Sequence, residues 1–167
     1  MAQATNDDEA RIKVRAMLDG IGTVMLVTQA ADGTLQARPM APQAIEGDTV
    51  WFFHVTGTPK SMQIAQDSDV LLAAANPSSQ DYVSAKGKAR TMKDPAKAKA
   101  LWSESARVWF PKGAEDPELE LIAVTITGAE YWDSPSSTAL HAYGYVKALA
   151  TGERPAGGDN QKVSFQG

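Results

Sequence analysis

The chain has 167 residues, of which 43% are hydrophobic and 22% are charged. This size and balance fit one globular domain and argue against a disordered chain. Cysteine is absent, which excludes disulfides, thiolate metal sites and cysteine nucleophiles, and two histidines make a histidine-rich centre unexpected, so we predict no metal site. The net charge of −4 argues against binding to nucleic-acid polymers or anionic membranes.

No apolar run in the sequence approaches the ~20 residues that cross a bilayer. The first residues also lack the basic and apolar regions of a secretory signal. We therefore expect a cytoplasmic protein that does not associate with membranes.

The chain opens with a helix predicted over residues 6–18, because Asn6 and Glu9 have capping-box spacing and apolar residues recur at helical spacing. Extended segments follow, and Asp32-Gly33 between the first two is a strong hairpin signal. Six such segments are predicted: 23–28, 35–45, 49–55, 70–75, 82–92 and 119–132.

Two shorter helices are predicted where an N-cap residue precedes a proline, at Thr58-Pro59 and at Asp94-Pro95. A last helix is expected over residues 138–150. These helices interrupt or follow the strands and are expected to pack around them.

We predict one domain over residues 1–152 and a loosely ordered tail over 153–167, which is rich in glycine and proline. Hairpin connections between the first three strands imply antiparallel pairing. Six short strands that close on one another make a mainly β (α+β) barrel with peripheral helices.

The usual catalytic and nucleotide-binding signatures fail in this sequence. There is no Gly-x-Ser-x-Gly elbow and no His-Glu-x-x-His zinc motif. The segment 57–61 resembles the end of a P-loop, but Pro59 and His54 stand where that motif needs glycines, so we reject ATP binding through a Walker motif.

One anion site survives at the start of the second helix. Thr58, Lys60 and Ser61 open this helix directly after a buried strand, so two hydroxyls, an ammonium and free amide groups are expected to face one spot. Arg38 on a preceding strand could add a forked guanidinium to the same phosphate. The alternative is a capped, solvated helix with Lys60 in water, which is the commoner outcome for such a lysine.

Aromatic residues accompany this site. Three adjacent rings at 51–53 cannot all face one way, so they are either buried on both faces or line a cavity. His54 follows them and is expected to be a core or cleft residue rather than a catalytic base. Trp109-Phe110 stands where a helix meets a loop, which suggests a subunit interface or a ligand lid.

Several motifs in order carry a family resemblance. They are Ala37-Arg38-Pro39-Met40, Trp51-Phe52-Phe53, Thr58-Pro59-Lys60, Tyr82-Val83-Ser84, Gly87-Lys88-Ala89, Leu101-Trp102, Trp109-Phe110-Pro111-Lys112-Gly113, Asp116-Pro117 and Glu130-Tyr131-Trp132-Asp133. Together they resemble the flavin-binding general stress proteins of the pyridoxamine 5′-phosphate oxidase-like superfamily. The resemblance implies a split β-barrel, a homodimer, and FMN, with FAD as an alternative, in clefts at the dimer interface.

The resemblance also assigns flavin-binding roles by position. Arg38 and Lys60 would hold the phosphate, with hydrogen bonds from Thr58 and Ser61. The remaining cofactor-binding residues are expected to be Pro39 and Met40 along the flavin edge, Phe53, His54 and Val55 under the ring system, and Trp109, Phe110 and Trp132 closing the cleft from the partner subunit.

Two departures argue against pyridoxamine phosphate oxidation. Gln43 stands where the oxidases carry a lysine for the substrate phosphate, and no Arg-x-His pair follows Trp132. The leading hypothesis is therefore a flavin-binding general stress protein whose redox role is unproven. The alternatives are an active FMN-dependent oxidoreductase using a small reductant, and a non-flavin module for another phosphorylated or nucleotide ligand.

Overall fold

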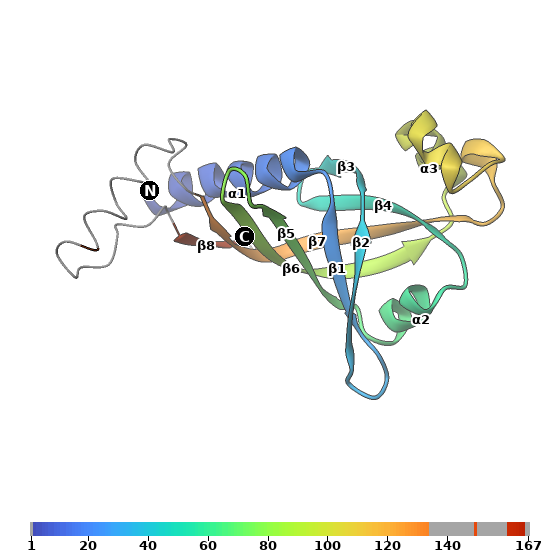
Figure 1. Cartoon of the computed structure of the whole chain (residues 1–167), viewed down its shortest axis with the longest axis horizontal. Helices are drawn as coiled ribbons and strands as arrows, with labels where there is room; N and C mark the ends of the chain where they lie inside the picture. The colour runs from blue at the N-terminus through green and yellow to red at the C-terminus, as the bar shows by residue number, and fades with distance from the viewer. Residues whose placement is uncertain (1, 134–148, 150–159, 166–167) are drawn as a thin grey trace.

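The computed structural model describes residues 2–133, 149 and 160–165 (Figure 1). The main elements, in chain order, are α1 (Ala2–Ile21), β1 (Val24–Gln29), β2 (Leu35–Met40), β3 (Pro42–Glu46), β4 (Thr49–Val55), α2 (Pro59–Gln66), β5 (Asp69–Asn76), β6 (Asp81–Met92), α3 (Pro95–Leu101), the 3-10 helices η1 (Glu104–Val108) and η2 (Gly113–Glu115), β7 (Leu119–Trp132) and β8 (Asn160–Ser164). No described helix is long and apolar enough to cross a membrane.

The strands form one antiparallel sheet in the order β2-β1-β5-β6-β7-β4-β3, and β8 adds to β7. β2 and β3 are the two ends of this order, yet only Ala41 separates them in the chain. The sheet must therefore curl until its two ends lie close together. β2 and β3 do not pair with each other, so the curled sheet is a split β-barrel (Figure 1).

The prediction of an antiparallel barrel with peripheral helices is confirmed, but the prediction of six strands is wrong. The described chain has eight strands. The segment predicted over 35–45 breaks at Ala41, between Pro39 and Pro42, because proline cannot donate to a continuous ladder. The eighth strand, β8, lies in the segment expected to be a loose tail. The helix predicted over 138–150 lies outside the described residues apart from Leu149.

A bulge bends the long strands β6 and β7. Their register shifts between Lys86 and Gly87, which leaves Thr127 as an extra residue on β7. A Cβ on Gly87 would lie 2.6 Å from the carbonyl oxygen of Thr125, so only glycine fits there. The sequence signal of a kink or bulge at Gly87 is confirmed.

The main core lies inside the barrel and under α1. Ala10, Val14 and Leu18 are buried at four-residue intervals and form one face of α1. β8 contributes Val163 and the adjoining Phe165, both buried in the same cluster. The C-terminal segment thus belongs to the hydrophobic core.

A second cluster lies at the other end of the molecule, beneath α3 and η1. Its centre is Phe53, whose ring stacks near Trp102 and meets Phe110 edge-on, both at 6.1 Å between centroids. Trp51 and Leu121 are buried with it. Alternate residues of β4 therefore belong to two cores: Phe52 faces the barrel, and Trp51 and Phe53 face α3. Of the two predicted alternatives, burial on both faces is confirmed for these three rings.

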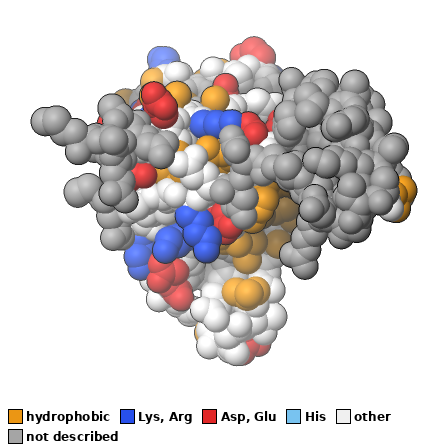
Figure 2. Space-filling view, turned by 90° about the vertical axis from the view of Figure 1, so that its left-hand side faces the viewer, with side chains coloured by type: hydrophobic (Ala, Val, Ile, Leu, Met, Phe, Trp, Pro, Cys, Tyr) orange, Lys and Arg blue, Asp and Glu red, His pale blue; other side chains and the backbone are white. Residues whose placement is uncertain are grey.

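Charged side chains are paired at the α1 end of the barrel. Lys13 contacts Asp133, Arg15 contacts Asp48, and Arg11 donates to the carbonyl oxygen of Ser164 at 2.8 Å. Figure 2 faces this end of the molecule and shows basic and acidic side chains lying next to one another on the described surface. Each of these three cations thus has an acceptor: a carboxylate for Lys13 and Arg15, and a carbonyl oxygen for Arg11.

Candidate functional site

A cleft of about 600 Å³ opens between the barrel mouth and the α3–η1 segment. Figure 1 shows α2 and α3 at the same end of the molecule, on opposite sides of the ends of β4 and β7. Nine of the predicted site residues line this cleft: Pro39, Met40, Phe53, His54, Val55, Thr58, Lys60, Trp109 and Phe110. The cleft volume falls within the roughly 300–1,000 Å³ of small-molecule sites.

Five further residues line the cleft: Thr23, Ala41, Gln43, Ser105 and Ala106. The sequence analysis named only Gln43 among them, as the position of a lysine in the oxidases, and missed the other four. Ala41 lies at the break between β2 and β3, so recognising that break would have placed 39–43 at the barrel mouth. Ser105 and Ala106 come from η1, a short 3-10 helix that has no sequence periodicity strong enough to predict.

One wall of the cleft is an open strand edge. β3 pairs with β4 only as far as Phe52, whereas β7 continues along β4 to Val55. The amide of Thr56 donates to the carbonyl of Glu118 at 2.9 Å, which fixes the alternation of the β4–β7 ladder. The main-chain groups of Phe53 and Val55 therefore point away from β7, toward the edge that β3 leaves uncovered.

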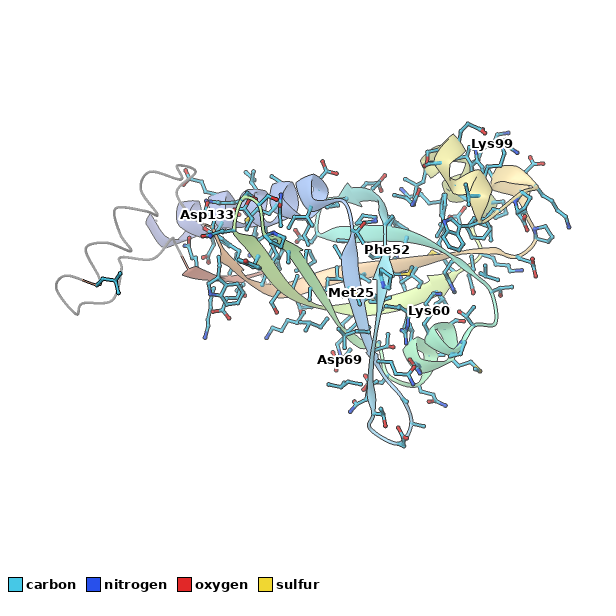
Figure 3. All side chains as sticks on the ribbon, viewed as in Figure 1. Met25, Phe52, Lys60, Asp69, Lys99 and Asp133 are labelled. Carbon is cyan, nitrogen blue, oxygen red and sulfur yellow. The ribbon has the colours of Figure 1, made fainter. Side chains whose placement is uncertain are left out.

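Lys60 stands at the first turn of α2 (Figure 3). With Thr58 it lines the part of the cleft where the sequence analysis expects a phosphate, which is called the anion end below. Its ammonium is half-buried, and burial, followed by the nearby charge of Arg38, lowers its pKa. Burial likewise lowers the pKa of Arg38. The charge of Arg38 thus reaches Lys60, whereas the joint role of the two cations at a phosphate stays a prediction.

Arg38 is held in place by neutral acceptors beside the cleft. Its guanidinium donates to the hydroxyl of Thr28 at 2.7 Å and to the amide oxygens of Gln36 and Gln63, both at 3.2 Å. None of the ion pairs between described residues includes Arg38 or Lys60. Two partly buried cations thus share one region without a carboxylate to neutralise them.

The start of α2 offers fewer free amides than expected. Pro59 has no N–H, and the amides of Ser61 and Met62 both donate to the carbonyl of Thr58, at 3.0 and 3.4 Å. The Ser61 hydroxyl donates to the same carbonyl at 2.8 Å and is buried away from the cleft lining. The anion end therefore depends on the Lys60 and Arg38 side chains and the Thr58 hydroxyl, and the role of Ser61 stays a prediction.

His54 lies beneath the cleft floor. Its side chain has no exposed surface, and its Nε2 lies 3.2 Å from a carboxylate oxygen of Glu120. Neither ring nitrogen has a partner in hydrogen-bond geometry among the described residues. Burial, followed by the charge of Lys60 and against a weaker opposing contribution from the Val55 backbone, lowers the pKa of His54 to about 4. The ring is therefore neutral near pH 7, and its contact with Glu120 is not an ion pair there.

The opposite wall of the cleft is aromatic. Phe110 is buried in the second core, whereas Trp109 is 76% exposed at the rim. Trp132 lies elsewhere: it pairs with Tyr82 at the far end of β7, roughly 40 Å along the strand from Leu119. Within one chain Trp132 is outside the cleft, and its contribution to a partner's cleft stays a prediction.

Comparison with known proteins identifies the family of this chain. The chain belongs to the pyridoxamine 5′-phosphate oxidase like family, whose family model matches residues 9–156. No curated protein matches the chain.

Three solved structures illustrate the likeness. General stress protein 26 from Jannaschia sp. CCS1 aligns with a TM-score of 0.74 and 24% identity over 99% of this chain and 100% of that chain. A general stress family protein from Xanthomonas campestris pv. campestris is 30% identical over 78% of this chain and 90% of that chain, with a TM-score of 0.66. The general stress FMN/FAD binding protein from Xanthomonas citri is 28% identical over 76% and 89%, with a TM-score of 0.65.

Proposed function

We propose that this chain binds FMN in the cleft, with Lys60 and Arg38 holding the phosphate. The observation that carries the proposal is the pair of partly buried cations that no carboxylate contacts among the described residues. A phosphate monoester carries close to two negative charges at neutral pH and would neutralise both. The name of the Xanthomonas citri structure, an FMN/FAD binding protein, supports a flavin as the ligand.

The rest of the cleft suits a flat, partly polar ring system. The open edge of β4 at Phe53 and Val55 offers main-chain donors and acceptors, which a flavin pyrimidine ring could use. Met40 and Phe110 offer apolar surface for the rest of the rings. A bound flavin would supply electron transfer, while these residues orient it and exclude water.

We further propose that the chain is a homodimer with the cleft at its interface. The outward faces of β1, β2 and β5 place apolar side chains side by side: Met25 lies opposite Pro39 and Ala73, and Val27 lies opposite Leu71. Pro39 also lines the cleft, so this apolar face continues into the proposed binding site. A second copy covering this face would enclose the flavin edge.

We infer that oxidation of pyridoxamine 5′-phosphate is not the activity of this site. Gln43 lines the cleft at the position where the resemblance expects a lysine for the substrate phosphate. A neutral amide lacks the charge for that contact. We expect no peroxide release with pyridoxamine 5′-phosphate, measured with flavin-loaded protein.

The test of the binding proposal is a titration of the purified protein with FMN and with FAD. Visible absorption and flavin fluorescence are followed together. Saturable binding with quenched fluorescence is expected for FMN. A protein that leaves the fluorescence of both flavins unchanged would contradict the proposal and would favour a site for another phosphorylated ligand.

A further inference from the structure

His54 is a buried polar side chain whose ring nitrogens have no well-formed hydrogen bond in the described chain, only a weak contact with the Val55 backbone, and it lies directly beneath the anion end of the cleft. Its side chain is fully covered, while its residue lines the cleft together with Thr58 and Lys60. Unpartnered buried polar groups are costly and rare in native proteins, so each one calls for an explanation. Packing alone does not provide one, since an apolar residue of this size would fill the same space without that cost.

The groups around His54 have opposite effects on the protonation of its ring. Glu120 approaches from β7 with a carboxylate oxygen 3.2 Å from Nε2, and a carboxylate at that distance favours the protonated ring. Burial disfavours it most, and Lys60 on α2 adds to this effect in the free protein. Arg38 on β2 is the other cation of this region and acts on Lys60. The neutral ring is thus held by burial and, in addition, by a cation that faces the ligand site.

We propose that His54 and Glu120 form a buried proton-accepting pair, and that a phosphate monoester entering beside Lys60 brings one proton onto the His54 ring. This inference rests on the proposed function, because it requires an anion at that end of the cleft. The dianion neutralises Lys60 and removes its repulsion, so that Glu120 then opposes burial alone and draws the proton onto the ring. The protonated ring donates to Glu120 and satisfies the buried contact.

The proton balance is simple. One proton passes from the solvent or its buffer to a His54 nitrogen, the ring becomes an imidazolium, and no other covalent bond changes. Glu120 is the route for this proton, since its side chain is 16% exposed whereas that of His54 is covered. The uptake makes binding of a phosphorylated flavin dependent on pH and leaves binding of riboflavin, which has no phosphate, without this dependence.

The experiment is isothermal calorimetry of the full chain at pH 7.0 with FMN and with riboflavin, in buffers of different ionisation enthalpy. We expect net proton uptake with FMN and none with riboflavin. Glu120→Gln should abolish most of the uptake, whereas the matched control Glu118→Gln, an exposed acid on the neighbouring turn, should retain it. FMN binding without proton uptake would overturn this inference and leave the proposed function intact.

A second measurement needs no flavin. NMR follows the ring of His54, which is distinguished from the one other histidine of the chain by its loss in His54→Gln. In the free protein, Lys60→Met should raise the His54 titration midpoint from about 4 toward 7, a shift at the upper end of the roughly 1–3 pH units that a nearby charge produces. An unchanged midpoint would overturn the coupling, even if FMN failed to bind and the proposed function fell separately.

Discussion

The two ends of this molecule differ in whether their cationic side chains have acidic partners. At the α1 end, Lys13 and Arg15 have carboxylate partners, and Arg15 also lies over the ring of Phe165. At the cleft end, Lys60 and Arg38 are more buried than surface cations normally are, yet no acid contacts either of them in the described chain. Paired charges and a continuous core indicate a structural end, whereas uncompensated charge beside an open cleft indicates a binding end.

The hydrophobic clusters follow the same division. The barrel core is continuous from α1 to β8, and it encloses Phe52 completely. The second core under α3 ends at Trp109, which is left exposed at the cleft rim. If this division is right, changes at the α1 end alter stability and leave binding unchanged, whereas changes to Lys60 or Arg38 at the cleft end weaken binding with little effect on stability.

The largest effect is expected from the C-terminal segment. Phe165→Ala should lower the free energy of unfolding by about 3–5 kcal/mol, because it removes a ring buried in the barrel core and beneath Arg11 and Arg15. Denaturant unfolding measures the loss, and Val108→Ala, at an 80% exposed position, is the control. FMN affinity should be unchanged, and a loss of affinity in the folded variant would break the division between the two ends.

His54 should make the protein sensitive to acid. Its pKa is about 4 in the folded state and about 6.5 unfolded, so the unfolded chain binds more protons between these values. The unfolding free energy should therefore fall by about 3 kcal/mol as the pH drops from about 6.5 to 4. Above pH 6.5 the ring is neutral in both the folded and the unfolded state, so His54 causes no pH dependence there. His54→Gln should remove this dependence in denaturant unfolding across the pH range. An identical acid limb in the variant would show that His54 is not its source.

Lys60→Met should weaken FMN binding with little loss of stability. Removing a charge-assisted contact to phosphate is expected to cost about 1.5–3 kcal/mol, or roughly 10- to 150-fold in affinity. Lys99→Met on α3 is the matched control, since Lys99 is exposed and outside the cleft. Fluorescence titration measures both. Equal affinity in the two variants would remove Lys60 from the site.

The smallest effect is expected at an exposed pair on the barrel wall. Lys88 and Asp69 lie 2.7 Å apart on neighbouring strands, with side chains 57% and 70% exposed. Asp69→Asn should change the unfolding free energy by about 1 kcal/mol or less, because solvent screens such pairs. A larger loss in thermal or denaturant unfolding would mean that surface pairs, and not the core, stabilise the barrel.

The sequence predicted those parts of the fold that depend on neighbouring residues. Asp94 caps α3 by accepting from the amide of Lys97, and the turn at Asp32-Gly33 joins β1 to β2. β8 could not be predicted, because its pairing with β7 is set by contacts more than 25 residues away. Thr58 begins α2 as predicted, but its side chain does not cap the helix, because Ser61 turns back onto the Thr58 carbonyl instead.

The site was predicted in part for the same reason. Lys60 and Thr58 are neighbours in sequence, and a strand followed by a helix start points to them directly. The open edge of β4 depends on where β3 stops, which depends on the break at Ala41. The contact between His54 and Glu120 joins residues 66 positions apart and could not be read from either residue alone.

The most direct test of the central claim compares FMN with riboflavin, which differs only by the phosphate. Dissociation constants for both ligands are measured by fluorescence titration for the natural chain and for Lys60→Met. We expect a clear preference for FMN in the natural chain, and a preference that largely disappears in the variant while riboflavin binding stays the same. An equal preference for FMN in both proteins would contradict a phosphate site at Lys60.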